Sequence, residues 1–191
     1  MEAIKLNNLS LEEYLKVELE TNTKYEYHDG SIYLMAGGTL NHGYICGNVF
    51  AEIRSSLREK GSNCRAINSE IKVHIQSKNC YLYPDTMIVC GEVEKSENEP
   101  NSITNPKVIV EVLSKSTANY DRGDKFYLYR QLDSLEEYIL IDQDRAQIDT
   151  HKRQGDLWKL SRISGIDNEL EIEILGIKVK LEEIYQDIEF V

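Results

Sequence analysis

Two short stretches of this chain are almost wholly apolar, and each is interrupted by a carboxylate. Residues 80–89 read Cys-Tyr-Leu-Tyr-Pro-Asp-Thr-Met-Ile-Val, where Asp85 and Thr86 break the apolar run. Residues 108–113 read Val-Ile-Val-Glu-Val-Leu, where Glu111 stands alone among Val, Ile and Leu. Near-continuous apolar runs of this length predict buried strands of a sheet.

The rest of the chain predicts helices and further strands around these two. Ser10 and Glu13 form a capping box before a helical run, and Asp29-Gly30 is a hairpin turn signal. The expected helices cover 11–20, 41–60 and 120–132, and the expected strands cover 24–28, 31–36, 70–75, 81–90, 107–113, 137–142, 147–152, 158–163 and 170–174. This order predicts a mixed α/β (α+β) fold with a central sheet flanked by helices.

Length and charge suit one soluble domain with acidic ends. The chain has 191 residues, enough for a single domain over 1–191 with a sizeable core. Of its net charge of −11, residues 1–29 contribute seven acids and three bases, and residues 167–191 contribute eight acids and two bases. The segment between them is nearly neutral and lacks a basic stripe, so we expect no tight non-specific binding to DNA.

The chain carries no signal for a membrane or for an oxidising compartment. No apolar run approaches the ~20 residues of a membrane span, and the N-terminus lacks the apolar centre of a signal peptide. We therefore expect a cytoplasmic protein. Its four cysteines, Cys46, Cys64, Cys80 and Cys90, contain no C-x-x-C pair, which argues against a zinc ribbon. We expect reduced and mostly buried thiols.

The two lone acids have two interpretations. A carboxylate inside a buried strand is costly unless it is paired or coordinates a metal, so each acid could cap a loop or pair with a buried Arg or Lys. If the two strands pair, Asp85 and Glu111 instead face one pocket. Two carboxylates, a backbone carbonyl and water molecules suit Mg²⁺ (or Mn²⁺). We favour the metal site because the same anomaly occurs in both strands.

The sequence around these acids resembles a known family. Pro84-Asp85 followed by Glu111-x-Leu113 resembles the PD…(D/E)XK signature of the restriction-endonuclease-like superfamily. The longer blocks Tyr-Pro-Asp-Thr-Met-Ile-Val-Cys-Gly, Val-Glu-Val-Leu-Ser-Lys-Ser-Thr and Tyr-Asp-Arg-Gly-Asp-Lys-Phe are similar to the Uma-two family of that superfamily. The resemblance covers most of residues 24–160. It implies a restriction-endonuclease-like core, a magnesium-dependent endonuclease acting on DNA, and a homodimer.

One position departs from the superfamily pattern. The signature lysine would fall at Leu113, and Lys115 lies roughly 13 Å along an extended strand from Glu111, which is too far. The superfamily allows the lysine to move to the following helix, where this chain has Lys125. Lys125 could also be a solvated lysine or a partner of Asp121.

Three further residues are weaker candidates for the site. The superfamily usually supplies another acid from the N-terminal part of the chain, and Glu26 lies in a matching block. Glu70 opens the strand before Asp85 and could share its face, although exposure to solvent explains this acid equally well. His42 could contact a phosphate or a water molecule, although a helix-capping or surface role explains it as well.

Three functions remain open at this stage. In a magnesium-dependent deoxyribonuclease, Asp85 and Glu111 would hold the metal, and Lys125 would position water or stabilise charge. In a catalytically degenerate protein, the same fold would bind nucleic acid or a protein partner without hydrolysis. In a third class, the carboxylates would act on a substrate other than nucleic acid, because fold alone does not fix function.

Overall fold

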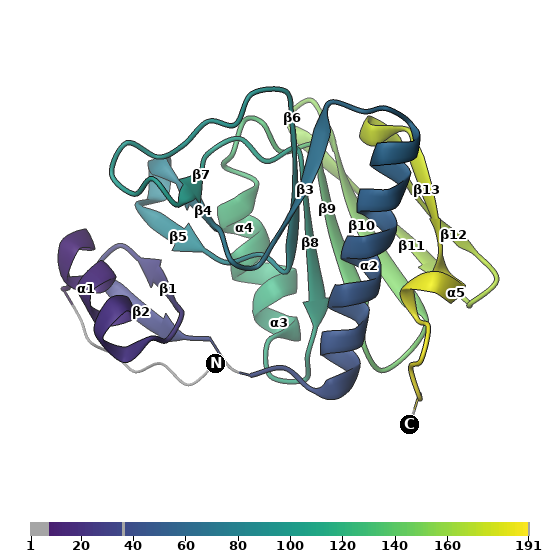
Figure 1. Cartoon of the computed structure of the whole chain (residues 1–191), viewed down its shortest axis with the longest axis horizontal. Helices are drawn as coiled ribbons and strands as arrows, with labels where there is room; N and C mark the ends of the chain where they lie inside the picture. Colours follow the sequence, from purple (N-terminus) through teal and green to yellow (C-terminus); the bar gives the residue numbers. More distant parts are fainter. Residues whose placement is uncertain (1–7, 36, 191) are drawn as a thin grey trace.

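The computed structural model describes residues 8–35 and 37–190 and contains a mixed sheet of six strands (Figure 1). The strands follow the order β11-β10-β9-β8-β6-β3 across this sheet. Their bounds are β3 Cys64–Asn68, β6 Thr86–Cys90, β8 Val108–Leu113, β9 Glu137–Asp142, β10 Gln147–Gln154 and β11 Leu157–Ser164. β8 and β9 are parallel, and the other neighbours are antiparallel.

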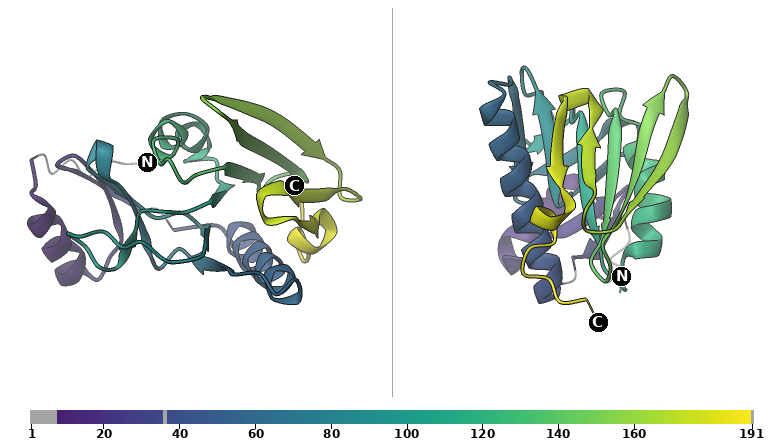
Figure 2. Two further views of the ribbon diagram at one scale, coloured as in Figure 1. Left: turned by 90° about the horizontal axis from the view of Figure 1, so that it is seen from above. Right: turned by 90° about the vertical axis from the view of Figure 1, so that its right-hand side faces the viewer.

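Helices cover both faces of this sheet (Figure 2). One face carries α2 (Leu40–Glu59), and the other carries α3 (Ala118–Tyr120), a π-helical turn η2 (Asp121–Lys125) and α4 (Phe126–Tyr129). The expected mixed α/β fold, with a central mixed sheet flanked by helices, is confirmed. Residues of β8 alternate between the two faces, so Val110 packs on the α2 side and Ile109 on the other side.

Helix α2 is fixed to the sheet by an apolar stripe and by its N-cap. The hydroxyl of Thr39 accepts a hydrogen bond from the His42 backbone N–H at 3.2 Å. Four side chains at four-residue steps are buried against the sheet: Ile45, Val49, Ile53 and Leu57. The C-terminal elements pack on the same core: β12 Glu169–Ile172, η3 Glu173–Leu175, β13 Ile177–Lys180 and α5 Leu181–Ile184.

A second sheet, of five strands in the order β2-β1-β5-β4-β7, lies beside the six-stranded sheet (Figures 1 and 2). Its elements are α1 Leu11–Thr21, β1 Tyr25–His28, β2 Ser31–Leu34, β4 Lys72–Ile75, η1 Gln76–Lys78, β5 Cys80–Leu82 and β7 Ser102–Ile103. Tyr14 of α1 packs on Tyr27 and Tyr81 of this sheet with ring centroids 5.0 and 6.4 Å away. The chain passes from this sheet to the six-stranded sheet between β5 and β6.

That passage corrects the prediction of one continuous strand over 81–90. β5 belongs to one sheet and β6 to the other, and Pro84 lies in the break between them. Proline has no backbone N–H to donate to a ladder, so a sheet strand readily ends there. Asp85 therefore lies immediately before β6, in the break between the two sheets, rather than inside a strand.

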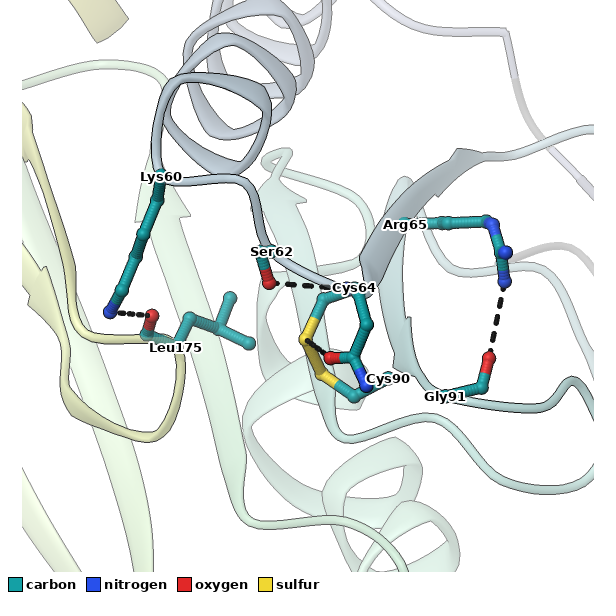
Figure 3. The surroundings of a disulfide bond; sticks show 8 residues. Lys60, Ser62, Cys64, Arg65, Cys90, Gly91 and Leu175 are labelled. Atoms are coloured by element: carbon teal, nitrogen blue, oxygen red, sulfur yellow. Dashed lines mark hydrogen bonds between the residues drawn. A yellow bond between two sulfur atoms is a disulfide. The ribbon is translucent and has the colours of Figure 1, made fainter.

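The cysteines differ from the sequence-based expectation. Cys64 and Cys90 face each other in the register of β3 and β6 and form a disulfide (Figure 3). The prediction of reduced thiols is wrong for this pair, because the sequence does not reveal that 64–68 is a strand beside β6. Cys46 and Cys80 are free. In the part of the chain that the structure describes, no helix has the length and hydrophobicity of a membrane span.

Candidate metal centre

The register of two strands brings Asp85 and Glu111 together. β6 pairs antiparallel with β8, with Thr86 opposite Val110, so Asp85 stands opposite Glu111 at the next step. The Asp85 backbone N–H donates to Glu111 Oε2 at 3.4 Å. Asp85 Oδ2 accepts a hydrogen bond from the Val112 backbone N–H at 2.7 Å, which fixes this carboxylate beside β8. The two acids that stood out in the sequence are therefore neighbours.

Glu111 faces the side of the sheet that α4 covers, and it contacts Lys125 there. Its side chain shares the parity of Ile109, which packs in the core under α4. Lys125 Nζ lies 2.8 Å from Glu111 Oε1, and the lysine side chain is 7% exposed. The Tyr129 hydroxyl donates to the same oxygen at 3.0 Å. The amine and the carboxylate are thus in direct contact.

The π-helical turn brings a further carboxylate to the same place. Asp121 and Lys125 both lie in η2 and are both buried. Lys125 Nζ is 3.8 Å from Asp121 Oδ1. Single π-turns within α-helices often occur at functional sites. The pairing with Asp121 considered from the sequence is present, and it coexists with the shorter contact to Glu111.

Glu26 reaches this group from the five-stranded sheet. It lies on β1, is 2% exposed, and places Oε1 3.1 Å from Lys125 Nζ. The Tyr120 hydroxyl donates to its other oxygen at 3.0 Å. Burial opposes ionisation of this acid, but the charges of Lys125 and His28 outweigh burial and lower the pKa of Glu26 to about 2. Glu26 is therefore ionised at neutral pH.

These side chains line a cavity with a volume of about 90 Å³. Four of its lining residues are carboxylic acids, Glu26, Asp85, Glu111 and Asp121, and Lys125 is buried among them. Burial and the neighbouring charge of Asp85 raise the pKa of Glu111 well above its usual value despite the nearby lysine. Burial opposes the charged form of Lys125, but Glu111 and Glu26 outweigh it and raise the pKa of the amine. The cavity therefore favours an additional cation.

His42 and Cys46 border Asp85 on the α2 side. His42 Nε2 lies 3.4 Å from Asp85 Oδ2, and Cys46 Sγ lies 3.5 Å from His42 Nδ1. One ligand atom from each of the three residues fits within 4.8 Å of the others. The hydrogen bond to Asp85 raises the pKa of His42. The side chain of His42 does not cap its helix, because Thr39 performs that role.

Comparisons with known proteins identify the family. The sequence profile of Uma2, described as "Putative restriction endonuclease", matches residues 11–182. The chain belongs to this family. Two uncharacterized proteins of Synechocystis sp. are 35% and 31% identical over 183 and 170 residues, which cover 95% and 88% of this chain and 94% and 95% of theirs.

A solved structure shares the fold. It is described as "a putative nuclease belonging to DUF820" from Anabaena variabilis. It aligns with a TM-score of 0.72 over 93% of this chain and 97% of its own, at 17% identity. The expected membership of the Uma-two family is thus confirmed. The chain also shares its fold with a solved structure that is described as a putative nuclease.

The structure brings most of the sequence-derived candidates together and leaves two outside. Asp85, Glu111, Lys125, Glu26 and His42 all line the cavity. Glu70 does not lie there, because its side chain is 68% exposed and pairs with Lys24 at 2.7 Å. Lys115 is exposed after the end of β8.

The sequence analysis did not identify three residues that contact the acids or the histidine of this site. Tyr129 and Tyr120 donate hydroxyl hydrogen bonds to Glu111 and Glu26, and Cys46 lies next to His42. Cys46 carried a usable signal, because it follows His42 by four residues on one helix and so shares its face. The tyrosines carried none, since their spacing also suits apolar packing.

Proposed function

We propose that this protein is a magnesium-dependent endonuclease that hydrolyses phosphodiester bonds in DNA. The observation that carries the proposal is the contact of three groups at one cavity: Asp85 beside Glu111, and the Lys125 amine 2.8 Å from Glu111. Membership of the Uma2 family supports a nuclease in general. The choice of metal and of DNA rests on the chemistry of these residues.

The donor set fits a hard divalent cation. Asp85 and Glu111 supply carboxylate oxygens from adjacent strands, and carboxylates with water are the ligands that Mg²⁺ prefers. The raised pKa of Glu111 means that its charged form lacks sufficient compensation without a cation. Asp85 and Glu111 would hold Mg²⁺, which would polarise a phosphate and lower the pKa of an attacking water molecule.

The surrounding residues would hold the reacting groups in place. The Val112 backbone N–H orients Asp85, and the Tyr129 hydroxyl orients Glu111. Glu26 holds the Lys125 ammonium at 3.1 Å, within reach of a phosphate bound in the cavity. Negative charge accumulates on the phosphate in the transition state, and a positioned ammonium stabilises it. Lys125 would thus serve in place of the absent lysine at Leu113.

A cleavage assay tests this function. Purified protein should nick or cut duplex, single-stranded or branched DNA with Mg²⁺ or Mn²⁺, and should be inactive with EDTA. Asp85→Asn should be inactive under all these conditions. An active Asp85→Asn variant would show that a contaminating nuclease, or another site, causes the cleavage. Activity that persists in EDTA would contradict the metal-dependent mechanism.

Two observations favour a competing function, the binding of nucleic acid or a protein without hydrolysis. Lys125 lies within 4.0 Å of three carboxylates, so its charge is already engaged, and the whole chain carries a net charge of −11. If metal binds but no DNA form is cleaved, this degenerate function replaces the first.

We also propose a cytoplasmic homodimer with one domain per chain. A dimer would let a nearly neutral surface contact more of a duplex than one copy does. Sedimentation of the purified protein tests it: a single species at the monomer mass of 22.0 kDa would contradict the dimer.

A further inference from the structure

We propose that His42, Cys46 and Asp85 form a second cation site, which takes a zinc-like divalent ion with nitrogen and sulfur preference. The two sites share the Asp85 carboxylate, so an ion held by His42 and Cys46 competes with the magnesium ion of the proposed nuclease. The competition rests on the proposed function, whereas the binding of the zinc-like ion stands on the geometry alone.

The distances between the three donor atoms suit one ion. In a tetrahedral site with metal–ligand bonds of about 2.0–2.3 Å, the ligands lie roughly 3.3–3.8 Å from one another. His42 Nε2 is 3.4 Å from Asp85 Oδ2 and 3.9 Å from Cys46 Sγ. All three donors fit within 4.8 Å of one another. Small rotations of the imidazole and thiol torsions bring them around a single centre, with a fourth position left for water.

The local fold holds two of the donors in place. His42 and Cys46 lie one helical turn apart in the first half of α2, so their side chains share a face. Gly38 lies against the imidazole: a Cβ there would meet His42 Nδ1 at 2.8 Å. The Thr39 cap fixes the start of the same helix. The histidine is therefore held toward Asp85 before any ion binds.

The chemistry of the donors separates the two sites. A thiolate and an imidazole select Zn²⁺, Co²⁺ or Cd²⁺ and are poor ligands for Mg²⁺, which prefers oxygen. Asp85 and Glu111 offer oxygen alone. The relative concentrations of these ions would therefore decide which ion the Asp85 carboxylate binds.

Cobalt absorption tests the binding directly. Co²⁺ added to protein that keeps the Cys64–Cys90 disulfide and has Cys46 and Cys80 as free thiols should produce a thiolate-to-cobalt charge-transfer band in the near ultraviolet. Cys80→Ser should keep the band, because Cys80, the other free cysteine, lies on β5 and is not among the three clustered donors. Cys46→Ser should lose the band and bind Co²⁺ at least about tenfold more weakly. A band that survives in Cys46→Ser, or its absence in the parent protein at saturating Co²⁺, would overturn the site.

Inhibition of cleavage tests the competition. With Mg²⁺ present, Zn²⁺ should inhibit the parent protein and Cys80→Ser, and excess Mg²⁺ should reverse the inhibition. With inhibition measured against each variant's own rate in Mg²⁺ alone, Cys46→Ser should need at least about tenfold more Zn²⁺ than the parent protein for the same fractional loss. Equal inhibition of both variants would overturn the competition. If no variant cleaves DNA but the cobalt band follows Cys46, the proposed nuclease fails while the cation site stands.

Discussion

Two buried lysines of this protein look alike in isolation and differ in their surroundings. Lys72 and Lys125 are each 7% exposed, and each contacts two carboxylates within 3.5 Å. Lys72 binds Glu18 at 2.7 Å and Glu99 at 3.3 Å, and its amine lies 5.2 and 5.7 Å from the ring centres of Tyr14 and Tyr83. Aromatic rings lie near both lysines, since the Lys125 amine is 6.0 and 5.9 Å from the ring centres of Tyr120 and Tyr129, so the two differ in charge rather than in aromatic contact.

Lys125 has a different balance of charge around it. Besides Glu111 and Glu26, Asp121 lies 3.8 Å from its amine, and Asp85 adjoins Glu111. The group borders a cavity of about 90 Å³. At Lys72, a buried lysine paired with two carboxylates thus has a structural role. With additional acids and adjoining space, as at Lys125, such a lysine becomes a candidate centre for chemistry, because the excess negative charge favours a cation.

The largest expected effect concerns a carboxylate that contacts Lys125 and also borders the cavity. Glu111→Gln should lower DNA cleavage by at least about a hundredfold, because a bound metal ion contributes several kcal/mol to the transition state. Glu99→Gln, the matched change beside Lys72, should keep the cleavage rate per folded molecule near that of the parent protein. Steady-state cleavage of a labelled duplex measures both. Equal losses in the two variants would remove the functional difference between the groups.

Substitution of either lysine should lower stability, but only substitution of Lys125 should also lower the cleavage rate. Lys72→Met and Lys125→Met each leave buried carboxylates without their partner, and such a change costs about 3–5 kcal/mol of unfolding free energy. Lys125→Met should also lower the cleavage rate at least about tenfold, or about 1.4 kcal/mol of transition-state stabilisation. Denaturant unfolding and cleavage rates measure the two effects.

The effect of Mg²⁺ on stability further distinguishes Lys125→Met from Lys72→Met. Mg²⁺ should raise the melting temperature of Lys125→Met more than that of Lys72→Met, because the ion then supplies the missing positive charge near Glu111. If Mg²⁺ stabilises the two variants equally, the Lys125 group does not hold the ion.

The pH dependence of stability tests the charge coupling around Lys125. The pKa of Glu26 is lowered from 4.5 to about 2 in the folded protein, so its ionised form stabilises the fold above pH 4.5. This contribution is lost as the pH falls from 4.5 to 2, and its full size is on the order of 3 kcal/mol. The stability difference between the parent protein and Glu26→Gln should shrink over that range. A constant difference in acid-unfolding experiments would contradict the coupling.

The smallest effect is expected at Lys115. This lysine is exposed, and it precedes the helical segment that carries Lys125. Lys115→Met should change the cleavage rate less than about twofold, as surface changes usually do. A larger loss in Lys115→Met than in Lys125→Met would reverse the assignment of the moved lysine.

The sequence predicted the two acids that the pairing of β6 and β8 brings together. Asp85 and Glu111 stood out because a lone acid in an apolar run is costly, and the strand register then makes them neighbours. The prediction for Glu70 assumed that 70–75 and 81–90 were full strands of one sheet. In the structure β4 begins at Lys72, and the chain leaves that sheet after Leu82, so Glu70 faces solvent beside Lys24.

Contacts between distant segments were beyond the sequence. Glu26 reaches Lys125 from the other sheet, and Cys64 pairs with Cys90 across β3 and β6. The strand Cys64–Asn68 lies at the sheet edge with half-buried and exposed side chains, so it lacks the apolar run that identified β8. The contact of Glu26 with Lys125 depends on how the two sheets are placed, and the disulfide depends on which strands pair within one sheet. No local pattern encodes either.

The central claim is that Asp85 and Glu111 form one divalent-cation site, and calorimetric titration with Mn²⁺ tests it most directly. The parent protein and Glu70→Gln should bind one ion with the same affinity, because Glu70 lies on the surface with Lys24. Asp85→Asn and Glu111→Gln should each lose this binding while remaining folded. Unchanged Mn²⁺ binding in both of these variants would contradict the account.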